Sequence, residues 1–114
     1  MRHYMNLFSE PFQMIKSGKK DIELRLYDEK RRKICVNDII VFTNIDTKEF
    51  IETECLKIHI AESFVKLFEM INNNERIGSQ VTETHEEMAE QMRVYYSKED
   101  EEKYGVVGIE VVLI

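Results

Sequence analysis

A lysine, a carboxylate and an arginine stand close together in the sequence, shortly after Gly18. Glu23 and Arg25 are two residues apart in an alternating segment, so their side chains are expected on the same face of a strand. Lys20 falls on the opposite face by parity, so either its long side chain reaches around the beginning of the strand or the strand twists there. Such a set can bind an anion, or transfer protons if burial shifts the pKa values of its members. The alternative is a surface ladder of ion pairs, each worth only about 0–1 kcal/mol.

Positive charge gathers around these residues, although the 114-residue protein has a formal net charge of −6. Residues 1–34 contain nine basic and five acidic residues, whereas residues 35–114 contain seven basic and 17 acidic residues. A positive face within an acidic protein suits a phosphate or carboxylate partner, but interspersed acids would also allow internal pairing. The cations that we expect to contact an anionic partner are Arg25, Lys19, Lys30, Arg31 and Arg32.

Other patterns that could support catalysis are weak. The three histidines are scattered without a ligand partner at i+2 or i+4, so we expect neither a metal ion nor a cofactor. No glycine-rich phosphate loop or serine nucleophile elbow is present. Cys35 and Cys55 are isolated, which predicts reduced thiols. Tyrosine combines a stacking face with a hydroxyl group, and we expect one of Tyr95, Tyr96 and Tyr104, with Tyr96 as the first candidate, to line a base-sized cleft.

Hydrophobic periodicity predicts the elements that must position these side chains. We expect a strand over 3–8, a helix that Ser9 caps and Gly18 stops, and an alternating strand over 20–27. A polar connection follows, in which Asn37 marks a turn. The remaining predicted elements are strands over 39–44, 48–60 (with a bulge or bend) and 106–114, and helices over 63–71, 84–96 and 97–104.

This order of elements predicts a single α+β domain over residues 1–114. The strands are too many and the chain too short for a large open sheet with both faces covered. A small, mixed, mostly antiparallel β-barrel with flanking helices fits better. No apolar run approaches the about 20 residues of a membrane helix, and no signal peptide is evident, so we expect a cytoplasmic protein without a membrane partner.

Three segments together resemble the ASCH domain, a PUA-like fold. They are PFxxIxSGxKxIExRxxD at 11–28, KIxVxDxIxF at 33–42 and the closing YxVVxIE at 104–110, and the similarity extends over nearly the whole chain. The details look like a compact, stand-alone bacterial type. The resemblance implies a PUA-like barrel and a partner that is RNA, a nucleoside or a nucleotide, held in a cleft beside the barrel. It leaves the oligomeric state open.

A more distant resemblance connects the chain to small amidohydrolases that remove the acetyl group from N(4)-acetylcytidine. Those enzymes use a lysine, a threonine and a glutamate. The resemblance places the lysine on Lys20, but Glu23 stands where they have the threonine, and a carboxylate would act as a base or an anchor rather than as a hydroxyl nucleophile. Glu69 and Glu83 are the candidates for the third residue.

Three functional hypotheses follow. In the first, the protein binds RNA or a nucleotide, and Glu23 accepts hydrogen bonds from a base or ribose. In the second, it hydrolyses an acylated nucleoside, with Lys20 activating water and Glu23 orienting it. In the third, it is an interaction module, which a flat and exposed setting of Lys20 and Glu23 would favour.

Overall fold

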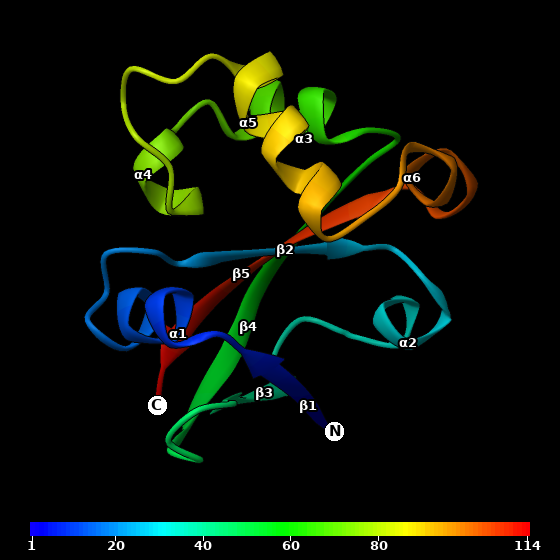
Figure 1. Ribbon diagram of the computed structural model, residues 1–114. Coiled ribbons are helices and arrows are strands. Elements are labelled where there is room, and N and C mark those ends of the chain that lie inside the picture. Colours follow the sequence, from blue (N-terminus) through cyan, green and yellow to red (C-terminus); the bar gives the residue numbers. More distant parts are fainter.

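The computed structural model describes residues 1–114 as a curled five-stranded sheet with helices inside its curl and in a layer on one side (Figure 1). The strands are β1 (Arg2–Leu7), β2 (Ile22–Leu26), β3 (Ile39–Asn44), β4 (Phe50–Ala61) and β5 (Val106–Leu113). The helices are α1 (Ser9–Lys16), α2 (Glu29–Arg32), α3 (Phe64–Ile71), α4 (Asn74–Ile77), α5 (His85–Gln91), the 3-10 helix η1 (Met92–Val94) and α6 (Lys98–Tyr104).

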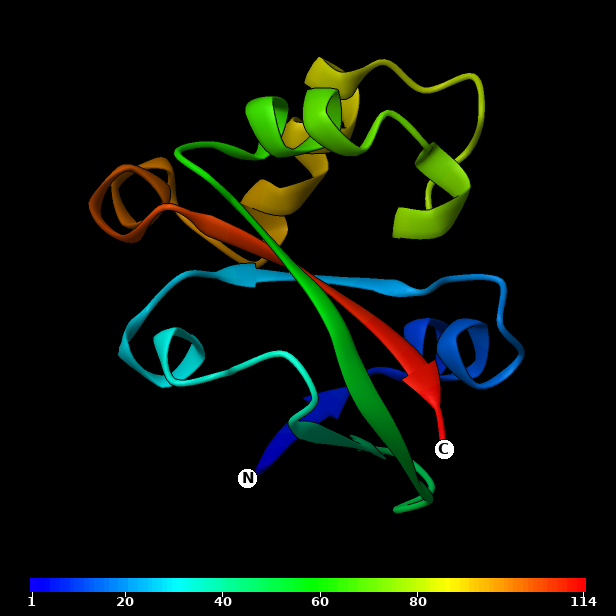
Figure 2. The same cartoon turned by 180° about the vertical axis from the view of Figure 1, so that it is seen from behind.

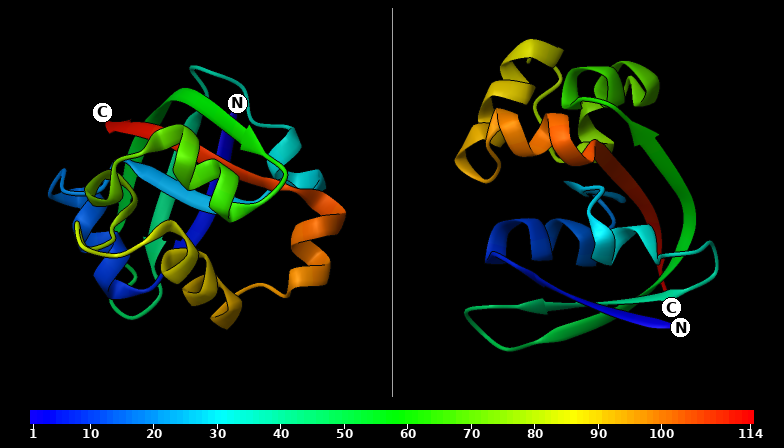
Figure 3. Two further views of the ribbon diagram at one scale, coloured as in Figure 1. Left: turned by 90° about the horizontal axis from the view of Figure 1, so that it is seen from above. Right: turned by 90° about the vertical axis from the view of Figure 1, so that its right-hand side faces the viewer.

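The sheet has the strand order β1-β3-β4-β5-β2, and only the β1–β3 pair is parallel. The helices α3, α4, α5 and η1 form a helical layer on one side of the sheet (Figure 1). The long strand β4 runs from this helical layer down to β3 (Figure 2), and the sheet bends around α1 and α2 (Figure 3, right). A register shift between Cys55 and Lys57 interrupts the β4–β5 ladder, which is how a long strand accommodates such a bend. The result is a half-barrel in which β1 and β2 are the two unpaired edges.

Two hydrophobic cores hold this arrangement together. One fills the curl of the sheet, where Phe12 of α1 packs with Phe42 and Ile109. The other lies between β2 and the helical layer, where Ile22 packs with Phe68. Each fully buried side chain of this size contributes about 1.5–3 kcal/mol relative to an exposed one. The second core contains Ile22, Leu24 and Leu26, so it fixes β2 against the helices above it.

Most of the expected elements are confirmed, together with several of their local signals. Ser63 caps α3, Thr84 and Glu87 form a capping box on α5, and Asn37 adopts a φ of 78° in the turn before β3. The mixed α+β architecture and the curled sheet agree with the predicted fold class. No helix is both long enough and apolar enough to span a membrane.

Four details differ from the prediction. Phe8, not Ser9, is the N-cap of α1, and the Ser9 hydroxyl accepts a hydrogen bond from Asn44. The polar connection after β2 contains α2, a single turn that Asp28 caps. A short α4 follows α3, and the helix expected over 84–96 ends at Gln91 and continues as η1. Both single-turn helices are too short to show a hydrophobic period, which is why periodicity misses them.

Candidate functional site

A pocket of about 220 Å³ opens between the end of β1, the strand β2 and the helical layer. Figure 1 shows elements that contribute to its lining, with α1 and β2 below and α4 and α5 above. Its walls combine a few charged groups with mostly apolar and aromatic side chains, as ligand sites commonly do. The lining residues are Asn6, Leu7, Phe8, Pro11, Lys20, Glu23, Leu24, Arg25, Phe68, Ile77, Ser79, Met88, Gln91, Met92, Tyr95 and Tyr96.

Lys20, Glu23 and Arg25 meet at this pocket and contact one another. Lys20 Nζ lies 3.2 Å from Glu23 Oε1, and Arg25 Nε donates a hydrogen bond of 3.0 Å to Glu23 Oε2. Lys20 precedes β2 in the turn that follows Gly18, where its own N–H donates to the Met14 carbonyl. The side chain therefore starts outside the strand and reaches Glu23 despite its parity. The arrangement is a buried cluster, not a surface ladder.

Burial and charge define what this cluster can do. The side chains of Lys20, Glu23 and Arg25 are 8%, 7% and 15% exposed, and they carry two positive charges and one negative charge. Both Glu23 oxygens already contact a cation, so this carboxylate serves as an anchor that orients its neighbours. Lys20 also donates a hydrogen bond of 2.9 Å to the Ile77 carbonyl. An ammonium group has three N–H donors, so Lys20 keeps one for a ligand.

Arg25 has a second role, because it bridges the two open edges of the half-barrel. Its terminal nitrogen donates a hydrogen bond of 2.9 Å to the carbonyl oxygen of Asn6 in β1. The guanidinium group thereby connects β2 to β1, two strands that share no backbone ladder. This contact fixes the wall of the pocket that β1 and β2 form.

Aromatic residues line the same pocket as the charged cluster. Tyr96 is half-buried and stacks on Phe64 with ring centroids 5.9 Å apart, and burial raises the pKa of its hydroxyl. At the mouth, Phe8 and Tyr95 are 56% and 59% exposed, with ring centroids 6.4 Å apart. Exposed aromatic rings beside a pocket offer faces on which a planar ligand can stack.

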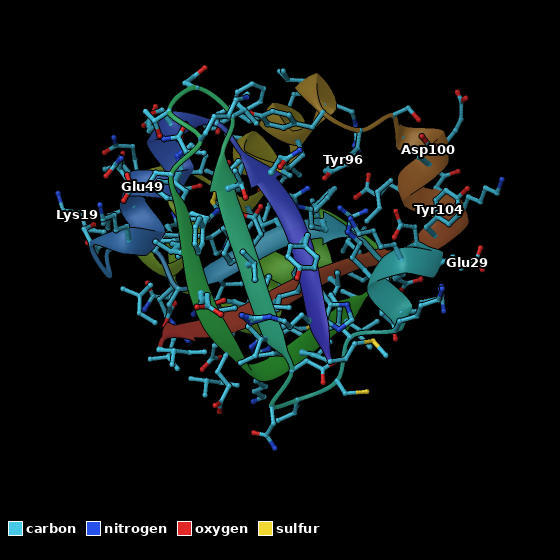
Figure 4. All side chains as sticks on the ribbon, turned by 90° about the horizontal axis from the view of Figure 1, so that it is seen from below. Lys19, Glu29, Glu49, Tyr96, Asp100 and Tyr104 are labelled. Carbon is cyan, nitrogen blue, oxygen red and sulfur yellow. The ribbon has the colours of Figure 1, made fainter.

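The other cations predicted to contact a ligand lie outside the pocket, and three of them are occupied by protein groups. Lys30 donates to the Tyr4 carbonyl, Arg31 pairs with Asp28, and Arg32 donates to the Tyr104 carbonyl. Arg32 also lies over the Tyr27 ring. Lys19 is exposed at the periphery of the molecule, away from Tyr96 (Figure 4). Of the predicted ligand-binding residues, only Arg25 and Tyr96 line the pocket.

The two candidates for a third catalytic carboxylate also lie elsewhere. Glu69 is exposed on α3, and Glu83 accepts hydrogen bonds from the Gln80 backbone and the Gln91 side chain. Glu23 is thus the only carboxylate that lines the pocket. No group of three or more His, Cys, Asp or Glu side chains is arranged to hold a metal ion.

Sequence reasoning missed the wall that the helical layer contributes. Apart from the tyrosines, its residues Ser79, Met88, Gln91 and Met92 come from segments more than 50 positions after Lys20. The helical period of Met88 and Met92 indicated only that both side chains face inward. Nothing in their spacing showed that they would face Lys20 and Glu23.

Comparisons with known proteins identify a family and two similar solved structures. The sequence-family model of the ASCH domain matches residues 5–114. The crystal structure of the hypothetical protein PH0355 is 38% identical in sequence, with full coverage of both chains and a TM-score of 0.87. The solution structure of protein PF0455 from Pyrococcus furiosus is 36% identical and covers 100% of this chain and 98% of that chain, with a TM-score of 0.76. A search of curated proteins gave no match, so the likenesses to a bacterial type and to acetylcytidine amidohydrolases stay predictions.

Proposed function

This chain belongs to the ASCH domain family, and from that premise we propose that it binds RNA or a nucleotide by taking one nucleobase into the pocket beside β2. Family membership supports an RNA-binding or hydrolase-like role in general terms. The proposal adds the ligand group and its position.

The observation that carries the proposal is the pairing of aromatic faces with buried cations around one small pocket. Base recognition outside a duplex combines stacking on aromatic rings with hydrogen bonds to the base edge. Tyr95 and Tyr96 supply the rings, while Lys20 supplies a buried donor and Arg25 a positive charge. The volume of about 220 Å³ is below the about 300–1,000 Å³ of pockets that hold drug-sized ligands. A single base fits this size better than a whole nucleotide, so ribose and phosphate would remain at the mouth.

The test is a binding titration with the four ribonucleoside monophosphates and a short single-stranded RNA. We expect Lys20→Met and Tyr96→Ala to weaken binding, the latter by about 1–3 kcal/mol, the value of one base–aromatic stack. Lys19→Met is the matched control, because Lys19 neighbours Lys20 in sequence but is exposed outside the pocket. Equal affinities for Lys20→Met and the parent protein would contradict the proposal.

Salt dependence checks which cations take part. Lys30, Arg31 and Arg32 already bind protein groups, so we expect few phosphate contacts. Each neutralised phosphate on a single strand contributes about −0.7 to the slope of log affinity against log salt. We therefore expect a slope between 0 and about −1.4. A steeper slope would show that the cations of α2 leave their protein partners to bind phosphate.

The second candidate function is hydrolysis of an acylated nucleoside such as N(4)-acetylcytidine. The observation that favours it is the buried Lys20–Glu23 pair at the pocket. In this reaction a water oxygen bonds to the acyl carbon, the amide C–N bond breaks, and the leaving amine takes up a proton. Lys20 would orient the water or carry the proton. Both carboxylate oxygens of Glu23 already contact a cation, so Glu23 would have only an orienting role.

This candidate has its own direct test. The protein is incubated with N(4)-acetylcytidine, and cytidine release is followed by chromatography, with Lys20→Ala as the inactive comparison. Turnover by the parent protein that Lys20→Ala abolishes would establish hydrolysis. Binding of acetylcytidine without turnover would leave the protein as a binder.

A further inference from the structure

The pocket lies against the unpaired edge of β2 rather than against one of its faces. Glu23 and Arg25 point to one side of the strand, and Leu24 points to the other. All three nevertheless line the same pocket. Residues from both faces of a strand can border one space only where that space extends along the strand's edge. The backbone of β2 therefore forms part of the pocket wall.

The register between β2 and β5 determines which backbone groups point into this space. The Val111 N–H donates a hydrogen bond to the Asp21 carbonyl, and the Tyr27 N–H donates to the carbonyl of Gly105, the residue before β5. Hydrogen-bonded pairs in an antiparallel ladder recur every second residue, so Glu23 and Arg25 also belong to such pairs. Leu24, opposite Gly108, therefore falls in a non-hydrogen-bonded pair. Its N–H and C=O both point away from β5, toward the free edge. Ile22 and Leu26 share this orientation but do not line the pocket.

The edge of β1 differs from the edge of β2 in this respect. On β1, the Tyr4 and Asn6 carbonyls accept hydrogen bonds from Lys30 and Arg25. No side chain or turn of the protein donates to the Leu24 carbonyl or accepts from its N–H. Leu24 is nonetheless only 9% exposed. What distinguishes Leu24 from Ile22 and Leu26 is that it lines the pocket, so its unpaired donor and acceptor are available to a ligand there.

We infer that the main chain of Leu24 recognises the bound ligand. Its N–H donates to an acceptor on a planar ring, and its C=O accepts from a donor next to that acceptor. This inference rests on the proposed function and specifies how the base is held. A nucleobase presents such a pair on its Watson–Crick edge, for example a ring carbonyl beside a ring N–H. The ring edge would then meet the strand edge as a further strand would, while aromatic side chains cover its face.

The first experiment tests the ligand side. The nucleoside monophosphate that binds best is compared with its analogue methylated on the Watson–Crick edge, such as 3-methyluridine in place of uridine or 1-methylguanosine in place of guanosine. Losing a two-point edge contact costs about 1–3 kcal/mol, which corresponds to about a 5- to 150-fold weaker affinity. The matched control carries its methyl group elsewhere, as 5-methyluridine does, and should bind within about threefold of the parent.

The second experiment tests the protein side by amide hydrogen exchange in the full chain. In the free protein, the Leu24 amide should exchange faster than the amides of Glu23 and Arg25, which bond to β5. Added nucleotide should slow exchange at Leu24 by at least about tenfold. The amides of Ile22 and Leu26, also on the free edge but outside the pocket, serve as internal controls and should not change.

The outcomes separate this inference from the proposed function. Nucleotide binding that tolerates methylation on the Watson–Crick edge, with no new protection at Leu24, would overturn the inference and leave base binding intact. Failure of every nucleotide and RNA to bind would overturn both. Edge-selective binding together with protection confined to Leu24 would establish main-chain recognition.

Discussion

Glu23 holds two cations at the pocket, and its removal should be costly. Without its carboxylate, Lys20 and Arg25 would lie buried side by side with like charges. Breaking a buried ion pair by removing one partner costs about 3–5 kcal/mol, and we expect Glu23→Gln to lower the free energy of unfolding at the lower end of that range. Chemical denaturation monitored by circular dichroism measures this change.

The control for Glu23 is Glu52, whose partner Arg2 is 48% exposed. An exposed pair contributes about 0–1 kcal/mol, so Glu52→Gln should change stability far less. Adding Lys20→Met to Glu23→Gln should recover part of the loss, because it removes one of the two unpaired charges. Equal effects of Glu23→Gln and Glu52→Gln would show that the cluster contributes no more than a surface pair.

The two cysteines should differ sharply in reactivity. Cys55 is fully buried, and burial raises the pKa of its thiol to about 11, whereas Cys35 is exposed. Only the thiolate reacts with alkylating agents. At pH 8 we expect iodoacetamide to modify one thiol in the native protein and two in denaturant, with mass spectrometry locating the native adduct on Cys35. Rapid native labelling of Cys55 would contradict the buried setting.

At the scale of elements, the turn after α4 positions Lys20 through a glycine. Gly78 has a φ of +94°, and a Cβ atom there would lie 3.1 Å from Lys20 Cδ and 3.7 Å from Lys20 Nζ. Gly78→Ala would therefore strain the backbone by about 1–2 kcal/mol and also push the lysine side chain. We expect lower stability together with weaker nucleotide binding, measured by denaturation and by titration.

Gly18 offers a matched control for this prediction. Its φ is +83°, but no atom lies within 4 Å of a Cβ built there. Gly18→Ala should carry a similar backbone cost and leave the contacts of the Lys20 side chain unchanged. If both variants lose binding equally, general destabilisation would be the cause, and the contact between Gly78 and Lys20 would have no separate role.

At the scale of the whole molecule, Asp38 joins the beginning of the chain to its middle. Its carboxylate contacts His3 Nε2 at 2.8 Å, accepts from the Cys35 N–H and pairs with the Met1 amino group. The hydrogen bond from His3, followed by that from Cys35, lowers the pKa of Asp38 from 3.8 to about 2. A carboxyl group whose pKa is lower in the folded than in the unfolded protein stabilises the fold at pH values above its unfolded pKa. This stabilisation is lost as the pH falls toward the folded pKa.

The pH dependence of stability tests this role. The contribution of Asp38 should be complete above about pH 4 and should disappear between about pH 4 and about pH 2. Asp38→Asn should lower the melting temperature at pH 7 and flatten its decline over that acid range. Asp46→Asn, at an exposed turn position, is the control and should leave the profile unchanged. A parent-like acid profile for Asp38→Asn would contradict the prediction.

The sequence by itself determined features that depend on near neighbours. The capping residues Ser63 and Thr84, the turn at Asn37 and the strand that carries Glu23 all follow from periodicity or from one side chain's effect on the adjacent backbone. The family resemblance rested on the same local segments. The proximity of Lys20 to Glu23 was also foreseeable, because a long side chain three positions away can reach the carboxylate.

Only the tertiary structure decided where the pocket lies and which cations it includes. Strand order makes β2 an edge, so its unpaired Leu24 backbone borders the pocket, and this order results from pairings between distant segments. Contacts with distant backbone carbonyls likewise occupy Lys30 and Arg32, which looked free in the sequence. Such contacts join residues 26 and 72 positions apart, beyond the reach of any local pattern. Charge and side-chain type are local properties, whereas their availability to a ligand depends on what the fold brings beside them.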